Sequence, residues 1–112
     1  MDSILTSIKE LLGIQQEDTN FDTDIIFHIN TVIMTLRQMG VGPQEGFSIE
    51  DDETEWSDYI DDITMIEAVK SYMFMKVKLM FDPPTGSVLD AYKENIKELE
   101  WRLSVQVDPG DD

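Results

Sequence analysis

The chain has 112 residues, which predicts one domain, and its 24 acidic against 8 basic residues give a formal net charge of −16. Because cysteine is absent and there is one histidine, disulfide scaffolds, zinc fingers, thiol nucleophiles and multi-histidine metal sites are excluded, and so acidic a chain is not expected to grip nucleic acid by neutralising phosphates. A hydrophobic fraction of 41% is too high for a wholly disordered chain, and neither a membrane span nor a signal-peptide pattern is present, so we expect a soluble, intracellular-type domain.

The first predicted element is a short amphipathic helix over residues 3–12. Apolar side chains recur there at spacings of three and four, the period of one helix face. Asp2 or Ser3 can cap its free amide groups, and Gly13 is placed to end it. A polar, acidic linker over residues 14–20 follows.

A second, longer helix is predicted from Asp22 to about Met39. Asp22 is the expected N-cap, and Phe21 before it can pack on Ile26 as a hydrophobic staple. The β-branched residues of this segment would favour a strand if they alternated with polar ones. They recur at helical spacing instead, which favours the helix.

Residues 41–61 are predicted to be an irregular, acidic loop. No basic residue lies between Arg37 and Lys70, and a helix through this stretch would stack like charges. A calcium loop starting at Asp51 would need glycine where Trp56 stands, so a solvated loop is the preferred interpretation. Its apolar residues can hold it down or dock on a partner; they are Phe47, Ile49, Trp56, Tyr59 and Ile60. The carboxylates of this loop are Glu50, Asp51, Asp52, Glu53, Glu55, Asp58, Asp61 and Asp62.

The third helix is predicted over residues 62–81, with a capping box formed by Thr64 and Glu67. Apolar residues cover most of its circumference, so it should be central or lie in a subunit interface. Its methionines suit core packing first and an adaptable binding surface second. Its lysines could pair with the acidic loop of the same or of a neighbouring subunit. The candidate interface residues are Met65, Tyr72, Phe74, Met75, Lys70, Lys76 and Lys78.

A proline-containing break over residues 82–86 is expected to stop this helix. Ser87 can cap a fourth helix that continues to about residue 104 and forms an antiparallel hairpin with the third. Trp101 is interpreted as a packing residue first, and residues 105–112 as an extended or disordered tail. The prediction is an all-α protein: one domain over residues 1–104, built as a small bundle of four helices.

No pattern of catalytic residues stands out. Asp24 and His28 lie four residues apart and could share a ligand, but no third metal ligand is spaced to join them. There is no nucleophile elbow and no glycine-rich phosphate loop. We therefore expect no enzyme activity, no cofactor and no metal, although a metal-dependent carboxylate enzyme stays open as a third option.

The second half of the chain carries a family resemblance. The segments are residues 66–84, with the Asp-Pro-Pro stop, then Leu89-Asp-Ala-Tyr92, and then residues 96–103. With the Leu-Leu-Gly-Ile end of the first helix, they resemble the head–tail connector (adaptor, head-completion) proteins of tailed bacteriophages and prophages over about residues 4–103. These are packing motifs rather than catalytic ones.

The resemblance implies a structural subunit made in the cytoplasm of the bacterial host and built into the virion. Such proteins assemble as a ring beneath the portal protein, extend the DNA channel and offer a platform to the next head-completion or tail protein. DNA would pass without specific binding, and we expect the loop over residues 50–62 to face the lumen or a ring-end partner. The alternative is an acidic inhibitor or DNA mimic whose carboxylates occupy a basic site on a host protein.

Overall fold

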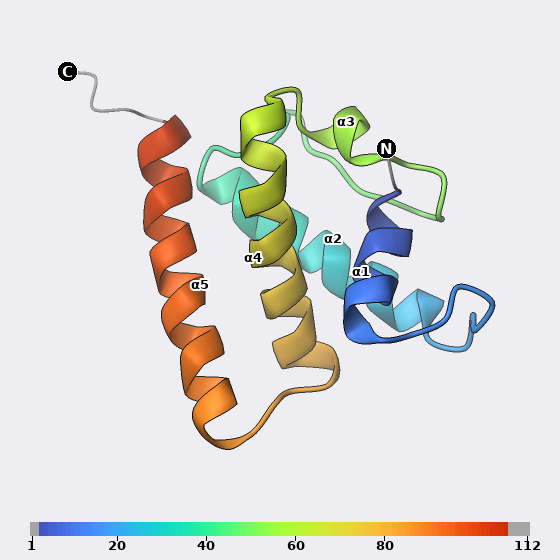
Figure 1. Cartoon of the computed structure of the whole chain (residues 1–112). Coiled ribbons are helices and arrows are strands. Elements are labelled where there is room, and N and C mark those ends of the chain that lie inside the picture. Colours follow the sequence, from blue (N-terminus) through green and yellow to red (C-terminus); the bar gives the residue numbers. More distant parts are fainter. Residues whose placement is uncertain (1–2, 108–112) are drawn as a thin grey trace.

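A computed structural model describes residues 3–107, and within them the chain is helical, as predicted. Five helices follow one another: α1 (Ile4–Leu12), α2 (Asp22–Gln38), α3 (Trp56–Tyr59), α4 (Ile63–Phe81) and α5 (Gly86–Val107). Four of them are those expected, and the short α3 lies inside the segment predicted to be irregular. The molecule measures 48 × 35 × 20 Å, and its smallest extent corresponds to two layers of helices (Figure 1).

The first helix has the predicted ends. The Ser3 hydroxyl accepts a hydrogen bond from the Thr6 amide at 3.0 Å. Gly13 ends the helix in the left-handed conformation, with φ at 81°, which glycine adopts without steric cost. Ile4, Leu5 and Ile8 of α1 are buried in the core, whereas Leu11 is 48% exposed.

The start of α2 differs from the prediction. Asp22 is the first helical residue rather than the N-cap, and its carboxylate forms an ion pair with the Lys9 ammonium at 2.9 Å. Phe21 takes the cap position without a side-chain bond, and its ring packs edge-to-face on Phe81 at 5.5 Å. The sequence predicted that Phe21 packs locally on Ile26. In the structure its ring contacts Phe81 at the end of α4, which is a long-range contact.

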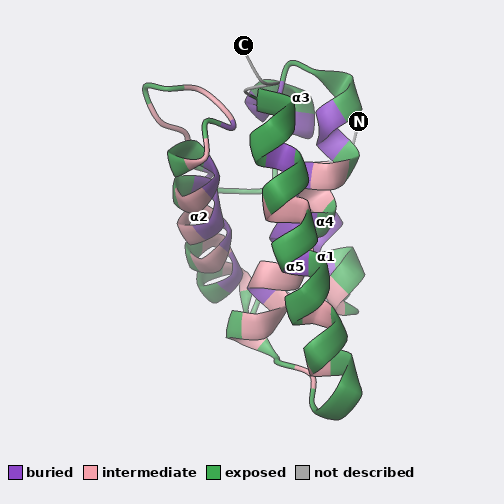
Figure 2. Cartoon of the chain, turned by 90° about the vertical axis from the view of Figure 1, so that its left-hand side faces the viewer, coloured by how far each residue is buried: buried purple, intermediate pink, exposed green. Residues whose placement is uncertain are grey.

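Helix α4 is the centre of the fold, as its apolar circumference predicted. It contacts α1, α2, α3 and α5 (Figure 2). Its N-cap is Asp62, whose side chain accepts from the Thr64 amide, so the predicted capping box at Thr64 is wrong by two residues. The residues that α4 buries are Met65, Ile66, Val69, Tyr72, Met73 and Val77.

Helix α5 runs antiparallel to α4 and forms the predicted hairpin (Figure 1). Helix α5 begins at Gly86, so Ser87 lies inside the helix and is not its N-cap as predicted. It also continues to Val107, so residues 105–107 are helical rather than part of an extended tail, and the rest of that predicted tail lies outside the described residues. Only Ile96 and Leu103 of α5 are buried, which leaves most of this helix exposed (Figure 2).

Candidate functional site

The acidic loop (residues 50–62) presents its carboxylates to solvent. All eight predicted partner-facing acids are exposed. Asp58 accepts from the Glu55 amide at 2.9 Å, and two hydrogen bonds from Thr64, one from its hydroxyl and one from its amide, lower the pKa of Asp62. None of the eight acids has a cationic partner among residues 3–107.

The backbone beneath these acids is firmly attached to the core. Trp56 is fully buried, and its indole Nε1 donates to the Ser7 hydroxyl of α1 at 3.0 Å. The Asn30 side chain of α2 makes two bonds to Ile49, donating to its carbonyl at 3.0 Å and accepting from its amide at 2.8 Å. Of the two roles left open for the loop's apolar residues, Ile49, Trp56, Tyr59 and Ile60 therefore hold it down. The acidic loop is therefore attached to α1 and α2 by specific hydrogen bonds and buried side chains.

The three lysines of α4 do not neutralise this acidic loop. Lys70 lies 3.9 Å from Glu67 and over the Trp56 ring, and Lys78 pairs with Asp82 at 3.0 Å. Lys76 lies over the Tyr72 ring, with its Nζ 5.8 Å from the ring centroid. The sequence left two pairings open for these lysines, with the acidic loop of the same subunit or of a neighbour. The first is not present within residues 3–107.

The predicted interface residues separate into two groups. Met65 and Tyr72 pack in the chain's own core, where burial and a hydrogen bond to Glu100 at 2.9 Å raise the pKa of Tyr72. Phe74, Met75 and Lys70 line a surface groove instead.

This groove, which we call the outer groove, runs along α4 between α1 and α5. One hollow of about 310 Å³ is lined by Leu11, Glu67, Lys70, Ser71, Phe74, Met75 and Tyr92. A second of about 270 Å³ is lined by Ser71, Met75, Asn95, Glu98, Leu99 and Arg102. The two hollows share Ser71 and Met75, so they adjoin each other along α4, and both have apolar and charged residues in their lining.

Sequence reasoning missed several exposed apolar side chains. Trp101 is 67% exposed rather than packed, because it lies on the face of α5 opposite Leu103. Phe27 and Met34, which are 68% and 59% exposed, lie seven residues apart on the outer face of α2. All three residues lie outside the apolar stripes of their helices, and this position in the sequence pattern could have predicted that they are exposed.

The geometry offers little for catalysis or metal binding. No group of three or more metal-ligating side chains converges within residues 3–107. His28 packs against the rings of Phe27 and Phe81, and its Nδ1 is buried without a hydrogen-bond partner among the described residues. Among the described helices, none has the length and apolar character needed to cross a membrane.

Comparison with protein families gives one match. A family model described as phage connector protein matches residues 4–110, which is nearly the whole chain. Searches of curated proteins and of solved structures gave no match.

Proposed function

The chain belongs to the phage connector protein family, and from this premise we propose that it is a structural virion protein that forms a ring below the portal protein. The ring would extend the DNA channel and provide the platform for the next head-completion or tail protein. The family match over residues 4–110 carries this proposal.

The outer groove supports self-association. Phe74 and Met75 are half-buried on a surface that α1 and α5 flank but do not cover. A head-to-tail contact between this groove and a different surface of the next copy closes into a ring when the rotation between copies is right. Of the three lysines of α4, Lys76 forms no ion pair within residues 3–107, so it is available to a carboxylate of a neighbour.

The acidic loop supports a channel or ring-end role. Its backbone is held to the core at Ile49 and Trp56, and its carboxylates are exposed and have no cationic partner within residues 3–107. A wall of carboxylates repels phosphates, so DNA would slide past it without being held. We propose that residues 50–62 face the lumen or the partner at one end of the ring.

The experiment is to incubate the purified portal complex with this chain and to measure co-elution and subunit number by sizing chromatography with light scattering. We expect several copies to co-elute with each portal complex. Phe74→Ser/Met75→Ser should abolish ring formation, whereas Phe27→Ser/Met34→Ser, which removes the same two residue types from the outer face of α2, should not.

The thermal midpoint of each variant shows whether it is folded. If the α2 variant fails to assemble and the α4 variant assembles normally, the assignment of the groove is wrong. If the wild-type chain ignores the portal and instead binds a basic DNA-binding protein, the DNA-mimic alternative replaces the proposed function.

A further inference from the structure

A row of exposed side chains follows the outer face of α5. Lys93, Lys97, Trp101 and Val105 lie four residues apart and therefore form one ridge along the helix, which we call the α5 ridge. All four residues are exposed, Trp101 to 67% and Val105 to 43%. The chain has a net charge of −16, so a ridge with two lysines and no acid differs from the rest of its surface.

The side chains of the α5 ridge point away from the chain's own core. Trp101 lies opposite Leu103, which is fully buried. Neither Lys93 nor Lys97 forms an ion pair within residues 3–107. Tryptophan is one of the residue types most enriched at the energetic centres of protein interfaces. A surface that receives this ridge must therefore hold an indole ring and an ammonium group.

The outer groove has the properties that such a surface needs. Its hollow of about 310 Å³ has four apolar lining residues, which are Leu11, Phe74, Met75 and Tyr92. A cavity of about 150 Å³ holds benzene, so this hollow has room for the larger indole ring. Glu67 lines the same hollow, and its side chain is 84% exposed. Because its carboxylate lies as far as 3.9 Å from Lys70, it remains able to bind a second cation.

The spacing of the polar groups matches between the two surfaces. Glu67 and Ser71 both line the hollow and lie four residues apart on α4. Lys97 and Trp101 lie four residues apart on α5. Each pair is thus separated by about 6 Å along its helix axis. An ammonium group can therefore meet the Glu67 carboxylate while an indole N–H meets the Ser71 hydroxyl.

We propose that the α5 ridge of one copy of this chain inserts into the outer groove of the next copy. Trp101 fills the hollow, and its indole N–H donates to the Ser71 hydroxyl of the next copy. Lys97 pairs with Glu67 of the same neighbour. The inference rests on the proposed function and names the two surfaces that meet between neighbours in the ring.

The ridge and the groove are different surfaces of one subunit. Leu99 and Arg102 of α5 line the groove, whereas Lys97 and Trp101 line neither of its hollows. Because ridge and groove share one helix, a copy cannot place its ridge in its own groove. It can offer the ridge to one neighbour while its groove receives the ridge of another. Such a head-to-tail contact closes into a ring when the rotation between copies is right.

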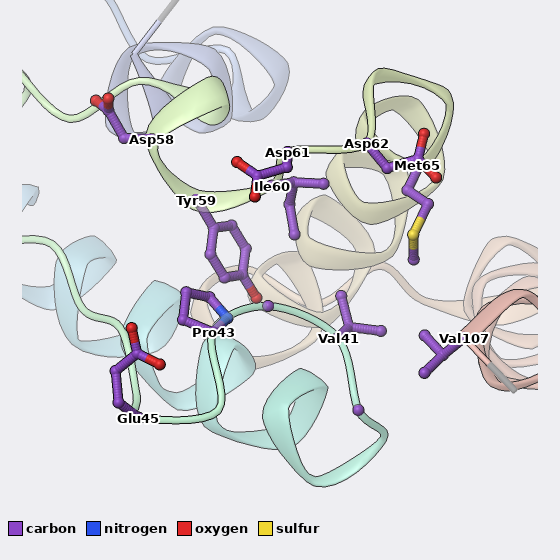
Figure 3. A pocket seen from close by; sticks show the side chains of 12 residues that line it. Val41, Pro43, Glu45, Asp58, Tyr59, Ile60, Asp61, Asp62, Met65 and Val107 are labelled. Atoms are coloured by element: carbon purple, nitrogen blue, oxygen red, sulfur yellow. The ribbon is translucent and has the colours of Figure 1, made fainter.

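A second hollow competes for the ridge on charge alone. It has a volume of about 470 Å³ and lies between the segment after α2 and the start of α4 (Figure 3). Its lining includes four exposed acids, which are Glu45, Asp58, Asp61 and Asp62. These carboxylates attract lysines, but an indole ring gains little beside exposed, hydrated charges. The outer groove suits both the indole and the ammonium group.

Crosslinking between introduced cysteines tests which surfaces meet. The chain has no cysteine, so every thiol is an introduced one. We expect Glu67→Cys/Lys97→Cys, assembled on the purified portal complex and treated with a short bis-maleimide reagent, to give a ladder of covalent oligomers on a denaturing gel. Each single variant should remain monomeric on that gel, because in a head-to-tail contact neither residue meets its own counterpart. Asp61→Cys/Lys97→Cys, directed at the acidic hollow, should give no ladder.

The same gel separates this contact from the proposed function. Assembly on the portal without a ladder from Glu67→Cys/Lys97→Cys would overturn the contact and leave the ring in place. A ladder from Asp61→Cys/Lys97→Cys would assign the ridge to the acidic hollow, and dimers from Lys97→Cys alone would mean a two-fold contact between ridges. Either result overturns the proposal. Failure of the wild-type chain to assemble on the portal would overturn the proposed function and this contact with it.

Replacing the tryptophan tests the apolar half of the contact. Trp101→Ser should weaken assembly about tenfold or more, as expected for an interface anchor. Its thermal midpoint should stay unchanged, because the side chain is exposed in the single copy. Phe27→Ser removes an aromatic ring of matching exposure, 68%, from α2 and should leave assembly unchanged. Equal assembly of the two variants would contradict the role of Trp101.

Charge reversal tests the polar half. Glu67→Lys makes the chain less acidic, so general repulsion between copies would fall and assembly would improve if charge acted only unspecifically. We expect the opposite, a weakening of about fivefold, and the same for Lys97→Glu. Glu67→Lys/Lys97→Glu has the wild-type net charge and should restore assembly. Stronger assembly of Glu67→Lys, or a double variant no better than the single ones, would overturn the pairing.

Discussion

Lys9 is a charged side chain that is 2% exposed at the point where α1 and α2 meet. Its ammonium donates to the carbonyl oxygens of Gln16 and Asp18, at 3.1 and 2.8 Å, and lies 2.9 Å from the Asp22 carboxylate. The Lys9 side chain thus holds the backbone of the linker between α1 and α2 and compensates the negative charge of Asp22 at the start of α2. A buried charge is tolerated because it is fully partnered.

Removing Lys9 should therefore be costly. We expect Lys9→Ala to lower the free energy of unfolding by about 3 kcal/mol, because it leaves a carboxylate and two carbonyl groups without their partner. Urea denaturation followed by circular dichroism measures the change. Lys97→Ala, at an exposed position of α5, is the control and should change stability by less than about 0.5 kcal/mol. Equal stability of the two variants would contradict the assigned role of Lys9.

Buried tyrosines set the response of the fold to alkali. Burial raises the pKa of Tyr59, and burial together with the bond to Glu100 raises the pKa of Tyr72, both above the usual value of 10.0. A raised pKa in the folded state contributes stability that is present below pH 10 and is lost as the pH rises further. We expect the tyrosinate absorbance of these two residues to appear only together with loss of helical circular dichroism. Ionisation of all three tyrosines near pH 10 in a chain that stays helical would contradict this.

At the scale of elements, the segment between α2 and α4 is held by a few long-range bonds. The Asn30 amide clamps Ile49 from α2, Trp56 bonds to Ser7 of α1, and the Ile4 amide donates to the Thr54 carbonyl at 2.9 Å. These contacts fix a stretch that has little regular structure of its own. They account for an acidic loop that stays in place although its charges repel one another.

Breaking the Asn30 clamp should free this segment without unfolding the helices. We expect Asn30→Ala to speed hydrogen exchange of the Ile49 amide by about tenfold, in line with the loss of one or two hydrogen bonds. The amides of α4 should keep their protection. Thr31→Ala, whose hydroxyl bonds only within α2, should leave Ile49 unaffected. Uniform acceleration across all helices after Asn30→Ala would mean that the clamp supports the whole fold rather than the loop.

The helices α1, α2, α4 and α5 were predictable because each carries an apolar stripe at helical period. Gly13 after α1 and the prolines after α4 also marked where those helices end, whereas no such signal marked the end of α5. What the sequence could not provide were features created by distant contacts. Asp22 pairs with Lys9 instead of capping α2. Trp56 at the start of α3 is buried in the core, where it donates to the Ser7 hydroxyl of α1. Local patterns do not report such partners.

In the candidate site, too, the features with a local sequence pattern were predicted, and those created by contacts between distant segments were not. The acidic residues of the loop were identified from sequence and are exposed, since a run of charges without apolar periodicity has no face to bury. The groove on α4 was only partly predicted, because the pattern could not tell which of Tyr72, Phe74 and Met75 would be covered by α5. The cavity lined by Val41, Tyr59 and Val107, which come from three separate segments, had no local signal in the sequence.

At the scale of the whole molecule, charge and apolar surface are separated. Helix α3 and the acidic loop lie towards the end of the molecule where α4 begins (Figure 1), while the outer groove is lined by residues further along α4. Most of α5 is exposed, and it carries Trp101 on its outer face. A subunit with these distinct surfaces is suited to contact neighbours along its side and a different partner at its end, which is the arrangement that a ring requires.

The most direct test of this account is an electron-microscopic reconstruction of the purified portal complex incubated with the wild-type chain. We expect a closed ring of copies coaxial with the portal, with neighbours in contact at Phe74 and Met75, and with residues 50–62 at the lumen or at one end of the ring. A chain that stays monomeric beside an unoccupied portal would contradict it. So would a ring in which residues 50–62 lie wholly on the outer wall.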